Sequence, residues 1–242
     1  MRYLPPPNTK SAVFDFDGTI ADTSEGILDA HRTTMRALGI EDPGDEGLKR
    51  LIGENLFRVY AEKYGLGEDG GRKAAALYRE RYAGTGIHLA ALYPGFREML
   101  ETLRAAGIRT GVATLKAERF AETMLEEMGI RGLFDAVCGI GADDRMDKAG
   151  LIAQCMARCG STAEETVLVG DTENDRAGAE KAGTGFIGVT YGFGFRKGGN
   201  ADFLTADDPA AVAELILGRN GLEPAEQTDQ AEQARRGGDN RT

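Results

Sequence analysis

Two aspartates stand two residues apart in residues 11–23, which read SAVFDFDGTIADT. Asp15 and Asp17 end an apolar run, at the point where a short buried strand is expected to give way to an Asp-Gly turn. Such a pair is either a solvated turn or a site that needs both carboxylates. In the second case, one carboxylate can attack phosphorus while the other protonates the leaving oxygen and later activates water.

Further polar groups follow other expected strands. The strand IRTGVAT ends in Thr114, and the strand TVLVGD ends in Asp171, with Asp175 four residues further on. Lys148 stands at the start of an expected helix, after a loop that contains Gly and Asp. Because sites in a parallel α/β sheet form beyond the carboxyl ends of the strands, we expect these groups to converge on one edge.

Four carboxylates in one partly buried site would repel one another strongly. A divalent cation removes that repulsion, and Mg²⁺ prefers hard oxygen ligands. A lysine and a hydroxyl group beside the cation suit phosphoryl transfer, in which charge spreads over the equatorial oxygens of the phosphoryl group. The residue types therefore predict a Mg²⁺-dependent phosphoryl-transfer site.

The order of the expected elements indicates an α/β protein. From LYPGF onward, helices and strands alternate regularly, which is typical of a parallel, Rossmann-like sheet covered on both faces. Residues 23–86 instead have an entirely helical pattern, and an all-helical block inside an α/β chain predicts an inserted domain. We expect no internal repeats.

These patterns predict the boundaries of the domains. We expect a catalytic core of residues 1–20 and 93–218 and a small helical cap domain of residues 21–92, with hinges at 20–24 and 87–93. Residues 219–242 are almost without large apolar side chains after Leu222, so we predict a disordered tail there.

The composition narrows the class of protein. The chain has 242 residues, 41% of them hydrophobic, which is enough for one large domain with a smaller insert. A formal net charge of −10 without a Lys/Arg cluster argues against binding to a nucleic-acid polymer. No apolar run has the length of a membrane span or the form of a signal peptide, so we expect a cytoplasmic protein. The oligomeric state is not indicated.

The three cysteines lack a spacing that is typical of metal sites. Cys138, Cys155 and Cys159 are odd in number, have no CxxC pattern and have no histidine nearby. We predict buried free thiols rather than metal ligands or a disulfide framework.

Four motifs together resemble those of the haloacid dehalogenase superfamily of phosphatases. They are VFDFDGTIADT, Thr114, Lys148 and VGDTENDRAGAEKAG, and the resemblance extends to about the last expected helix. The helical block is similar to the small cap domain of that superfamily. The runs LYPGF, GVATLKAERFAETML and GVTYGFG resemble the phosphoglycolate-phosphatase-like branch, which includes relatives described as 5′-nucleotidases.

The resemblance implies roles for the matching aspartates. Asp15 would be the nucleophile, which forms an aspartyl-phosphate, and Asp17 the general acid/base. Asp15, the main-chain carbonyl of Asp17, and Asp171 would hold Mg²⁺, with Asp175 supporting the ion from nearby. An aspartate at position 17 favours a phosphatase over a dehalogenase.

The resemblance also implies which groups bind the substrate. Thr114 and Lys148 would bind the transferring phosphoryl group, and Lys116 could also reach it. We prefer Lys148 because the start of a helix directs donors toward an anion. Lys116 would otherwise be a solvated loop lysine. The cradle around the phosphoryl group would include the backbone near Phe16, Gly18 and Thr19.

Other residues have two interpretations each. Gly53, Glu54 and Asn55 interrupt a helical pattern and form either the loop that selects the substrate or an ordinary turn. Phe193 and Phe195 either wall the pocket or pack locally. The remaining candidates are interpreted as structural or solvated: Arg79, Arg81 and Tyr82 as an exposed helix face, and His31 and His88 as lone histidines.

The sequence thus predicts a phosphatase that acts on a small phosphomonoester, with 2-phosphoglycolate as the lead candidate. The third motif reads MDKAGLI and lacks the prolines of the Lys-Pro-x-Pro form found in many phosphoglycolate phosphatases. A 5′-nucleotidase or a sugar-phosphate phosphatase is therefore the alternative within the enzyme class. A non-catalytic protein that binds a phosphorylated metabolite is the alternative outside it.

Overall fold

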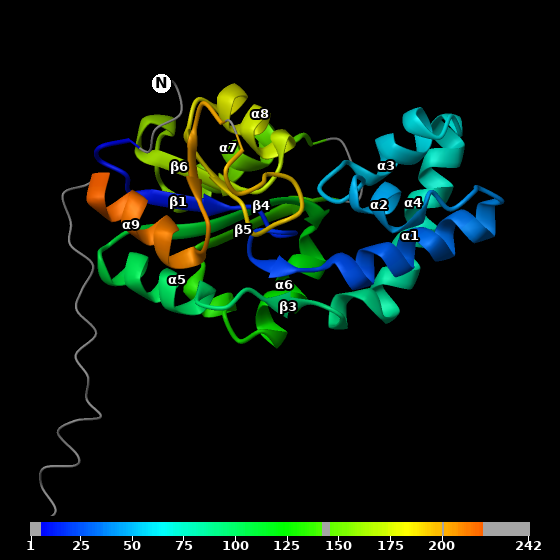
Figure 1. Ribbon diagram of the computed structural model, residues 1–242, viewed down its shortest axis with the longest axis horizontal. Helices are drawn as coiled ribbons and strands as arrows, with labels where there is room; N and C mark the ends of the chain where they lie inside the picture. Colours follow the sequence, from blue (N-terminus) through cyan, green and yellow to red (C-terminus); the bar gives the residue numbers. More distant parts are fainter. Residues whose placement is uncertain (1–5, 142–145, 200, 220–242) are drawn as a thin grey trace, which may run out of the picture.

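A six-stranded parallel sheet forms the centre of the molecule, in the strand order β5-β4-β1-β6-β7-β8 (Figure 1). The computed structural model describes residues 6–141, 146–199 and 201–219, so the tail predicted at 219–242 lies outside the described residues except for Arg219. The strands are β1 (Ser11–Phe14), β4 (Arg109–Ala117), β5 (Ala136–Ile140), β6 (Thr166–Gly170), β7 (Gly185–Val189) and β8 (Leu204–Ala206).

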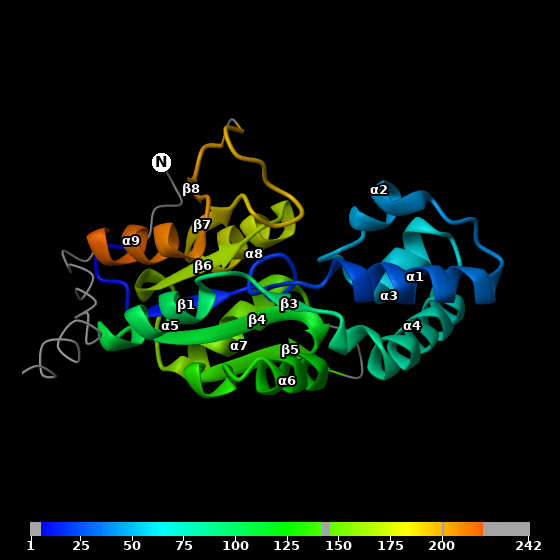
Figure 2. The same ribbon diagram turned by 60° about the horizontal axis from the view of Figure 1, so that its bottom comes forward.

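Alternate side chains of the strands enter two apolar layers, as the period of two along a strand requires. Ala12 and Phe14 of β1 belong to one layer, and Val13 belongs to the other. One face is covered by α5 (Phe96–Ala105), α6 (Glu118–Glu127) and α9 (Pro209–Arg219), and the other by α7 (Lys148–Cys159) and α8 (Glu173–Ala182) (Figures 1 and 2). The prediction of a Rossmann-like sheet covered on both faces is confirmed.

The chain between β2 (Ala21–Asp22) and β3 (Ala91–Leu92) is mostly helical and lies beside the sheet rather than on either of its faces (Figure 2). We call residues 23–88 the helical segment. Its two long helices pack against each other. Its elements are α1 (Ser24–Leu38), α2 (Gly44–Lys49), α3 (Leu56–Arg58), a π-helical turn (Val59–Lys63), α4 (Gly67–Gly84) and a 3₁₀ turn (Gly86–His88).

The two places where the chain passes between the sheet and the helical segment are hydrogen-bonded to each other. There β2 pairs with β3 as an antiparallel ladder. Neither strand was predicted, because two residues are too few to give a recognisable alternation. The ladder lies within the predicted hinge ranges 20–24 and 87–93.

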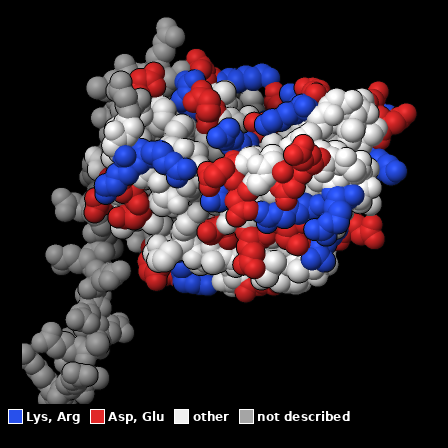
Figure 3. All heavy atoms as spheres, turned by 45° about the vertical axis from the view of Figure 1, so that its right-hand side comes forward, with Lys and Arg blue, Asp and Glu red and all other residues white. Residues whose placement is uncertain are grey.

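Three further features of the fold are the state of the cysteines, the distribution of surface charge and the character of the helices. Cys138, Cys155 and Cys159 are free and buried, as predicted. Figure 3 shows acidic and basic side chains interspersed over the visible face. Within the described ranges, no helix combines the length and the apolar character that crossing a membrane requires.

Candidate active site

The carboxyl ends of adjacent strands bring the predicted groups to one edge of the sheet. Asp15 directly follows β1, and its backbone N–H donates to the carbonyl of Val169 in β6 (2.9 Å). Asp171 directly follows β6. Thr114 lies within β4, where the pairing with β5 shifts register between Ala113 and Ala117. Such irregularities re-aim side chains, which accounts for Thr114 reaching the same edge.

Two helix starts supply the remaining groups. The side chain of Asp147 caps α7 by accepting from the backbone N–H of Gly150 (2.9 Å), which places Lys148 in the first turn. Thr172 and Asp175 form a capping box at the start of α8. In that box, the N–H of Thr172 donates to Oδ2 of Asp175 (3.0 Å), so Oδ1 of Asp175 remains directed toward the site.

Three buried carboxylates and one lysine form the centre of the edge. Asp15, Asp171 and Asp175 each offer an oxygen within 4.8 Å of the others. Lys148 Nζ lies 2.5 Å from Oδ1 of Asp15 and 2.6 Å from Oδ1 of Asp175. The arrangement joins four of the predicted site residues.

The negative charge of this group exceeds what Lys148 can balance. Burial raises the pKa of Asp15 to about 7, Lys148 opposes that rise, and Asp175 and Asp17 add to it. Burial, followed by repulsion from Asp175 and Asp15, raises the pKa of Asp171 well above its ordinary value. Burial acts to lower the pKa of Lys148, but attraction to Asp15 and Asp175 outweighs it and raises that pKa. A divalent cation with hard oxygen ligands fits such a donor set.

Asp17 has different partners. Its carboxylate is not part of the three-carboxylate group, so its predicted metal contact could involve only the main-chain carbonyl. Its Oδ1 instead accepts from Oγ1 of Thr23 (2.6 Å) and lies 3.0 Å from Nζ of Lys116. The carboxylates of Asp15 and Asp17, although two residues apart, therefore have separate environments.

Close backbone approach shapes the loop after β1. Gly18 has φ +81°, and a Cβ there would lie 2.3 Å from Oδ2 of Asp171, so a glycine is required. Thr19 is fully buried, with its Oγ1 3.4 Å from Oδ1 of Asp171. The side chain of Phe16 is buried in the apolar core, which leaves only its backbone for a phosphoryl group.

A second loop, whose Phe193 and Phe195 were expected either to wall the pocket or to pack locally, binds Asp171 from the other side through its backbone. The backbone N–H of Phe193 donates to Oδ2 of Asp171 (2.6 Å). Gly192 and Gly194 flank it, and a Cβ on either residue would lie within 2.5 Å of an atom of Asp171 or of Gly18. The glycines of GVTYGFG were the available signal. Phe195 packs locally against Phe186 and Phe203.

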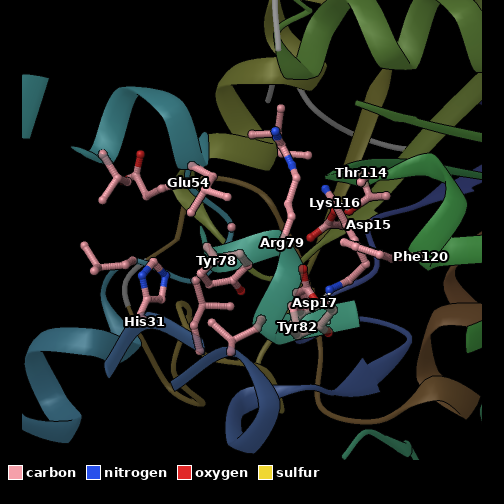
Figure 4. Close-up of a pocket in the computed structure, with 18 residues that line it drawn as sticks. Asp15, Asp17, His31, Glu54, Tyr78, Arg79, Tyr82, Thr114, Lys116 and Phe120 are labelled. Atoms are coloured by element: carbon pink, nitrogen blue, oxygen red, sulfur yellow. Dashed lines mark hydrogen bonds and ion pairs between the residues drawn. The ribbon is translucent and has the colours of Figure 1, made fainter. Parts of the chain in front are cut away.

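A cavity of about 60 Å³ adjoins Asp15 and Asp17 and is lined by both parts of the chain (Figure 4). The core contributes Asp15, Asp17, Thr114, Leu115, Lys116, Ala117 and Phe120. The helical segment contributes Ile27, His31, Leu51, Ile52, Gly53, Glu54, Leu56, Val59, Tyr78, Arg79 and Tyr82.

Only part of the predicted loop at residues 53–55 lies at the cavity. Gly53 and Glu54 line the cavity, whereas the side chain of Asn55 caps α3 by accepting from the N–H of Arg58 (3.0 Å). The carbonyl of Gly53 also accepts from Nδ2 of Asn174 in α8 (2.9 Å). The turn therefore contacts the core directly.

Two residues interpreted as exposed are buried at the cavity. The side chain of Lys116 is 5% exposed, so it is not a solvated loop lysine. Tyr82 is 1% exposed, so its assignment to a solvated helix face was wrong. The helical spacing could not show which face of α4 meets the core. Arg81, in contrast, pairs with Asp29 at the surface.

The two histidines differ in their surroundings. His31 is buried at the cavity, its Nδ1 lies 2.9 Å from the hydroxyl of Tyr60, and burial lowers its pKa to about 4. A neutral imidazole is therefore present there at pH 7. His88 lies at the surface beside Glu127.

The family model for haloacid dehalogenase-like hydrolases matches residues 12–189. A 5′-nucleotidase of Pseudomonas aeruginosa is 34% identical over 213 residues, which is 87% of this chain and 94% of that protein. A phosphoglycolate phosphatase of Vibrio parahaemolyticus is 30% identical over 86% of this chain and 92% of its own length. The tyrosine-protein kinase PtkA of Mycobacterium tuberculosis is 31% identical over 86% of this chain and 69% of its own length.

A solved structure supports the same assignment. It is described as a predicted phosphatase from Clostridium acetobutylicum, and it matches with a TM-score of 0.81 and 28% identity over 87% of this chain and 99% of that one. The fold and the carboxylate-lined edge define a Rossmann-like hydrolase. The chain belongs to the haloacid dehalogenase-like hydrolase family, and it is a phosphoric monoester hydrolase of that family.

Proposed function

We propose that the protein is a Mg²⁺-dependent phosphatase that hydrolyses a small phosphomonoester, with 2-phosphoglycolate as the lead substrate. The observation that carries the proposal is the meeting of Asp15, Asp171, Asp175 and Lys148 at one edge of the sheet, where Asp15 also lines the cavity together with Asp17. Nucleophile, acid/base and phosphate-binding groups of the required types lie together there.

Asp15 and Asp17 divide the chemistry in this proposal. A carboxylate oxygen of Asp15 forms a bond to phosphorus while the bond from phosphorus to the ester oxygen breaks. The electron pair of that bond goes to the ester oxygen, which takes a proton from Asp17 and leaves as an alcohol. Water then attacks phosphorus and gives a proton to Asp17 while the bond between phosphorus and the Asp15 oxygen breaks. The electron pair of that bond returns to the Asp15 carboxylate, and phosphate leaves.

The other groups bind and balance charge. Lys148 and Thr114 would bind the oxygens of the transferring phosphoryl group, together with the backbone of residues 16–19. Asp15, Asp171 and Asp175 would hold Mg²⁺, with the carbonyl of Asp17 as the further ligand that the resemblance implies. The ion, when bound, neutralises the developing negative charge.

We assign the helical segment the role of a cap, within the division into a core of residues 1–20 and 93–218 and a cap of residues 21–92. The cavity supports this role because most of its lining comes from the helical segment. The β2–β3 ladder ties both crossings together and would be the hinge. Closure over the cavity would exclude water and select the substrate.

The size of the cavity favours a small leaving group. A single water needs about 10–15 Å³, so about 60 Å³ is room for a compact substrate rather than a nucleoside. A 5′-nucleotidase is the second candidate. It is favoured by a larger cleft of about 730 Å³, which shares Ile52, Gly53 and Glu54 with the cavity and has two tyrosines and Phe193 in its lining.

The test is phosphate release from 2-phosphoglycolate, nucleoside 5′-monophosphates and sugar phosphates, with Mg²⁺ or with EDTA. We expect turnover only with Mg²⁺, and a loss of about 10⁴-fold or more in Asp15→Asn because the nucleophile is gone. Asp29→Asn, at an exposed aspartate paired with Arg81, is the matched control and should keep full activity.

Two results would contradict the proposal. Asp15→Asn with full Mg²⁺-dependent activity would remove Asp15 as the nucleophile. A folded wild-type protein that binds phosphorylated metabolites but turns none over would favour the non-catalytic alternative. The best substrate of the panel decides between the phosphoglycolate and the nucleotide branch.

A further inference from the structure

Lys116 connects Asp17 to the helical segment. Its Nζ lies 3.0 Å from Oδ1 of Asp17 and donates to the hydroxyl of Tyr82 at 2.8 Å. The same Nζ lies 4.3 Å from the centre of the Tyr82 ring and 5.6 Å from that of Phe16. Such contacts of an ammonium with aromatic faces are attractive, and more so away from water. The lysine is therefore held between one carboxylate and one tyrosine.

Tyr82 has little freedom to move. Its ring is stacked on Tyr78 (5.7 Å between centroids) and packs against Phe120 (5.6 Å). A Cβ on Gly86 would lie 2.4 Å from the ring, so the backbone already fills that side. The hydroxyl also donates to Sδ of Met124 (3.7 Å), which fixes its orientation. A rigid tyrosine can set the position of the flexible lysine that it binds.

The contacts of Asp17 are one-sided. Thr23 and Lys116 both bind Oδ1. Among the described parts of the chain, no group hydrogen-bonds to Oδ2 of Asp17. A hydrogen bond from Thr23 and an ion pair with Lys116 on the same oxygen hold the carboxylate in place and leave the other oxygen to meet a substrate.

We propose that Tyr82 is a positioning residue for the acid/base step, which holds Lys116 on Oδ1 of Asp17 so that Oδ2 is presented to the leaving group. This inference rests on the proposed function, in which Asp17 protonates the ester oxygen as the bond to phosphorus breaks. Tyr82 lines the cavity, but its hydroxyl bonds Lys116 rather than Asp17, so it acts on the acid/base group through the lysine.

The arrangement couples the acid/base group to the position of the helical segment. Asp17 and Lys116 belong to the core side of the site, whereas Tyr82 belongs to α4. Displacing α4 would remove the hydroxyl and the ring from Nζ together. The acid is therefore correctly held only while the helical segment lies against the core as it does here.

The test is the dependence of kcat/KM on the pKa of the leaving group, measured with a series of substituted phenyl phosphates on the Mg²⁺-loaded protein. A good leaving group needs no proton, whereas a poor one does. We expect Tyr82→Phe, which keeps the ring, to lose about tenfold with the poorest leaving groups, a part of the about 10²–10⁴-fold that acid–base catalysis contributes. With the best leaving groups, we expect little change.

Two further variants separate positioning from structure. Lys116→Met should steepen the same dependence more than Tyr82→Phe does, because it removes the group that contacts Asp17. Tyr60→Phe is the matched control, since Tyr60 is another fully buried tyrosine of the helical segment, and its hydroxyl bonds His31. It should leave the slope unchanged.

The outcomes distinguish the two proposals. Equal loss by Tyr82→Phe across the series, or no loss, would overturn the positioning role while the phosphatase stands. A rise in KM alone would also overturn it and would place Tyr82 in substrate binding. If the wild type releases no phosphate in an Asp15-dependent way, the proposed function fails, and the role of Tyr82 fails with it.

Discussion

The strand edge and the helical segment both bury polar groups, but they differ in whether the protein alone can satisfy them. In the helical segment, His31 and Tyr60 bond each other as neutral groups, and burial lowers the pKa of the histidine to about 4. At the edge, Lys148 pairs with Asp15 and Asp175, Asp171 lies beside these two carboxylates, and negative charge remains in excess. His31 and Tyr60 satisfy each other within the helical segment, whereas the carboxylates of the edge need a ligand to balance their charge.

The largest expected effect on stability comes from removing the positive charge of Lys148 at the strand edge. Lys148→Met leaves Asp15 and Asp175 without their shared partner, and we expect a loss of about 3–5 kcal/mol of unfolding free energy, measured by urea at pH 8 in EDTA. Activity should fall with it. Because burial raises the pKa of Asp15 to about 7, Asp15 is protonated at lower pH, and the deficit should shrink as the pH falls toward 5.

Lys181 provides the matched control. It pairs with Asp147, but its side chain is 69% exposed. The same change, Lys181→Met, should cost about 1 kcal/mol or less because water already screens the pair. Equal losses of unfolding free energy in the two variants would mean that Lys148 contributes no more to stability than a lysine in a surface ion pair.

The second prediction concerns His31 in the helical segment and the dependence of stability on pH. Unfolded histidine takes up a proton near pH 6.5, whereas folded His31 does so only near pH 4. The unfolded state therefore binds more protons in this window, and stability falls as the pH drops from about 6.5 to about 4, by up to about 3 kcal/mol. Comparing the wild type with His31→Gln across this range isolates the contribution.

His88→Gln is the control, since it removes the other histidine, which is at the surface. Like the wild type, His88→Gln should lose stability as the pH drops from about 6.5 to about 4, whereas His31→Gln should lose much less. A wild type and His31→Gln with parallel pH curves would show that His31 is not held neutral by burial.

The smallest effect has the opposite sign. Folded Asp171 has a raised pKa, so the metal-free protein loses stability as the pH rises above the ordinary aspartate value and through that raised pKa. Asp171→Asn removes this repulsion and should therefore stabilise the metal-free protein at pH 8. Thermal unfolding in EDTA measures it.

The same variant should respond differently to Mg²⁺. The ion should raise the melting temperature of the wild type, because it binds the folded state, and raise that of Asp171→Asn much less. A variant that is less stable than the wild type in EDTA, or equally stabilised by Mg²⁺, would contradict the picture of an edge with excess negative charge.

The edge was largely predictable because parallel strands impose a rule on the sequence. Once β1, β4 and β6 are recognised as neighbours, Asp15, Thr114 and Asp171 must come to one side. The start of α7 likewise places Lys148. This rule does not predict the contact between Phe193 and Asp171, because Phe193 lies in a loop whose conformation does not follow from the strand order.

The helical segment was predicted less well, because helical spacing identifies a face but not what covers it. The pattern in residues 72–84 fits an exposed face as well as a buried one, so Tyr82 was misassigned. The contact between Tyr82 and Lys116 joins residues 34 positions apart in sequence. The β2–β3 ladder was too short to be recognised, and β8 stands after a loop that has no regular pattern.

The central position of β1 has a consequence for how the protein is made. Ser11, near the beginning of the chain, pairs with Arg109 on one side and with Thr166 on the other. During synthesis, the first strand must wait for most of the chain to leave the ribosome before its second neighbour exists, and such non-local pairing is slow. The helical segment, built from local contacts, can form earlier. The newly made protein thus acquires its cluster of carboxylates only after Asp171 and Asp175 have been synthesised.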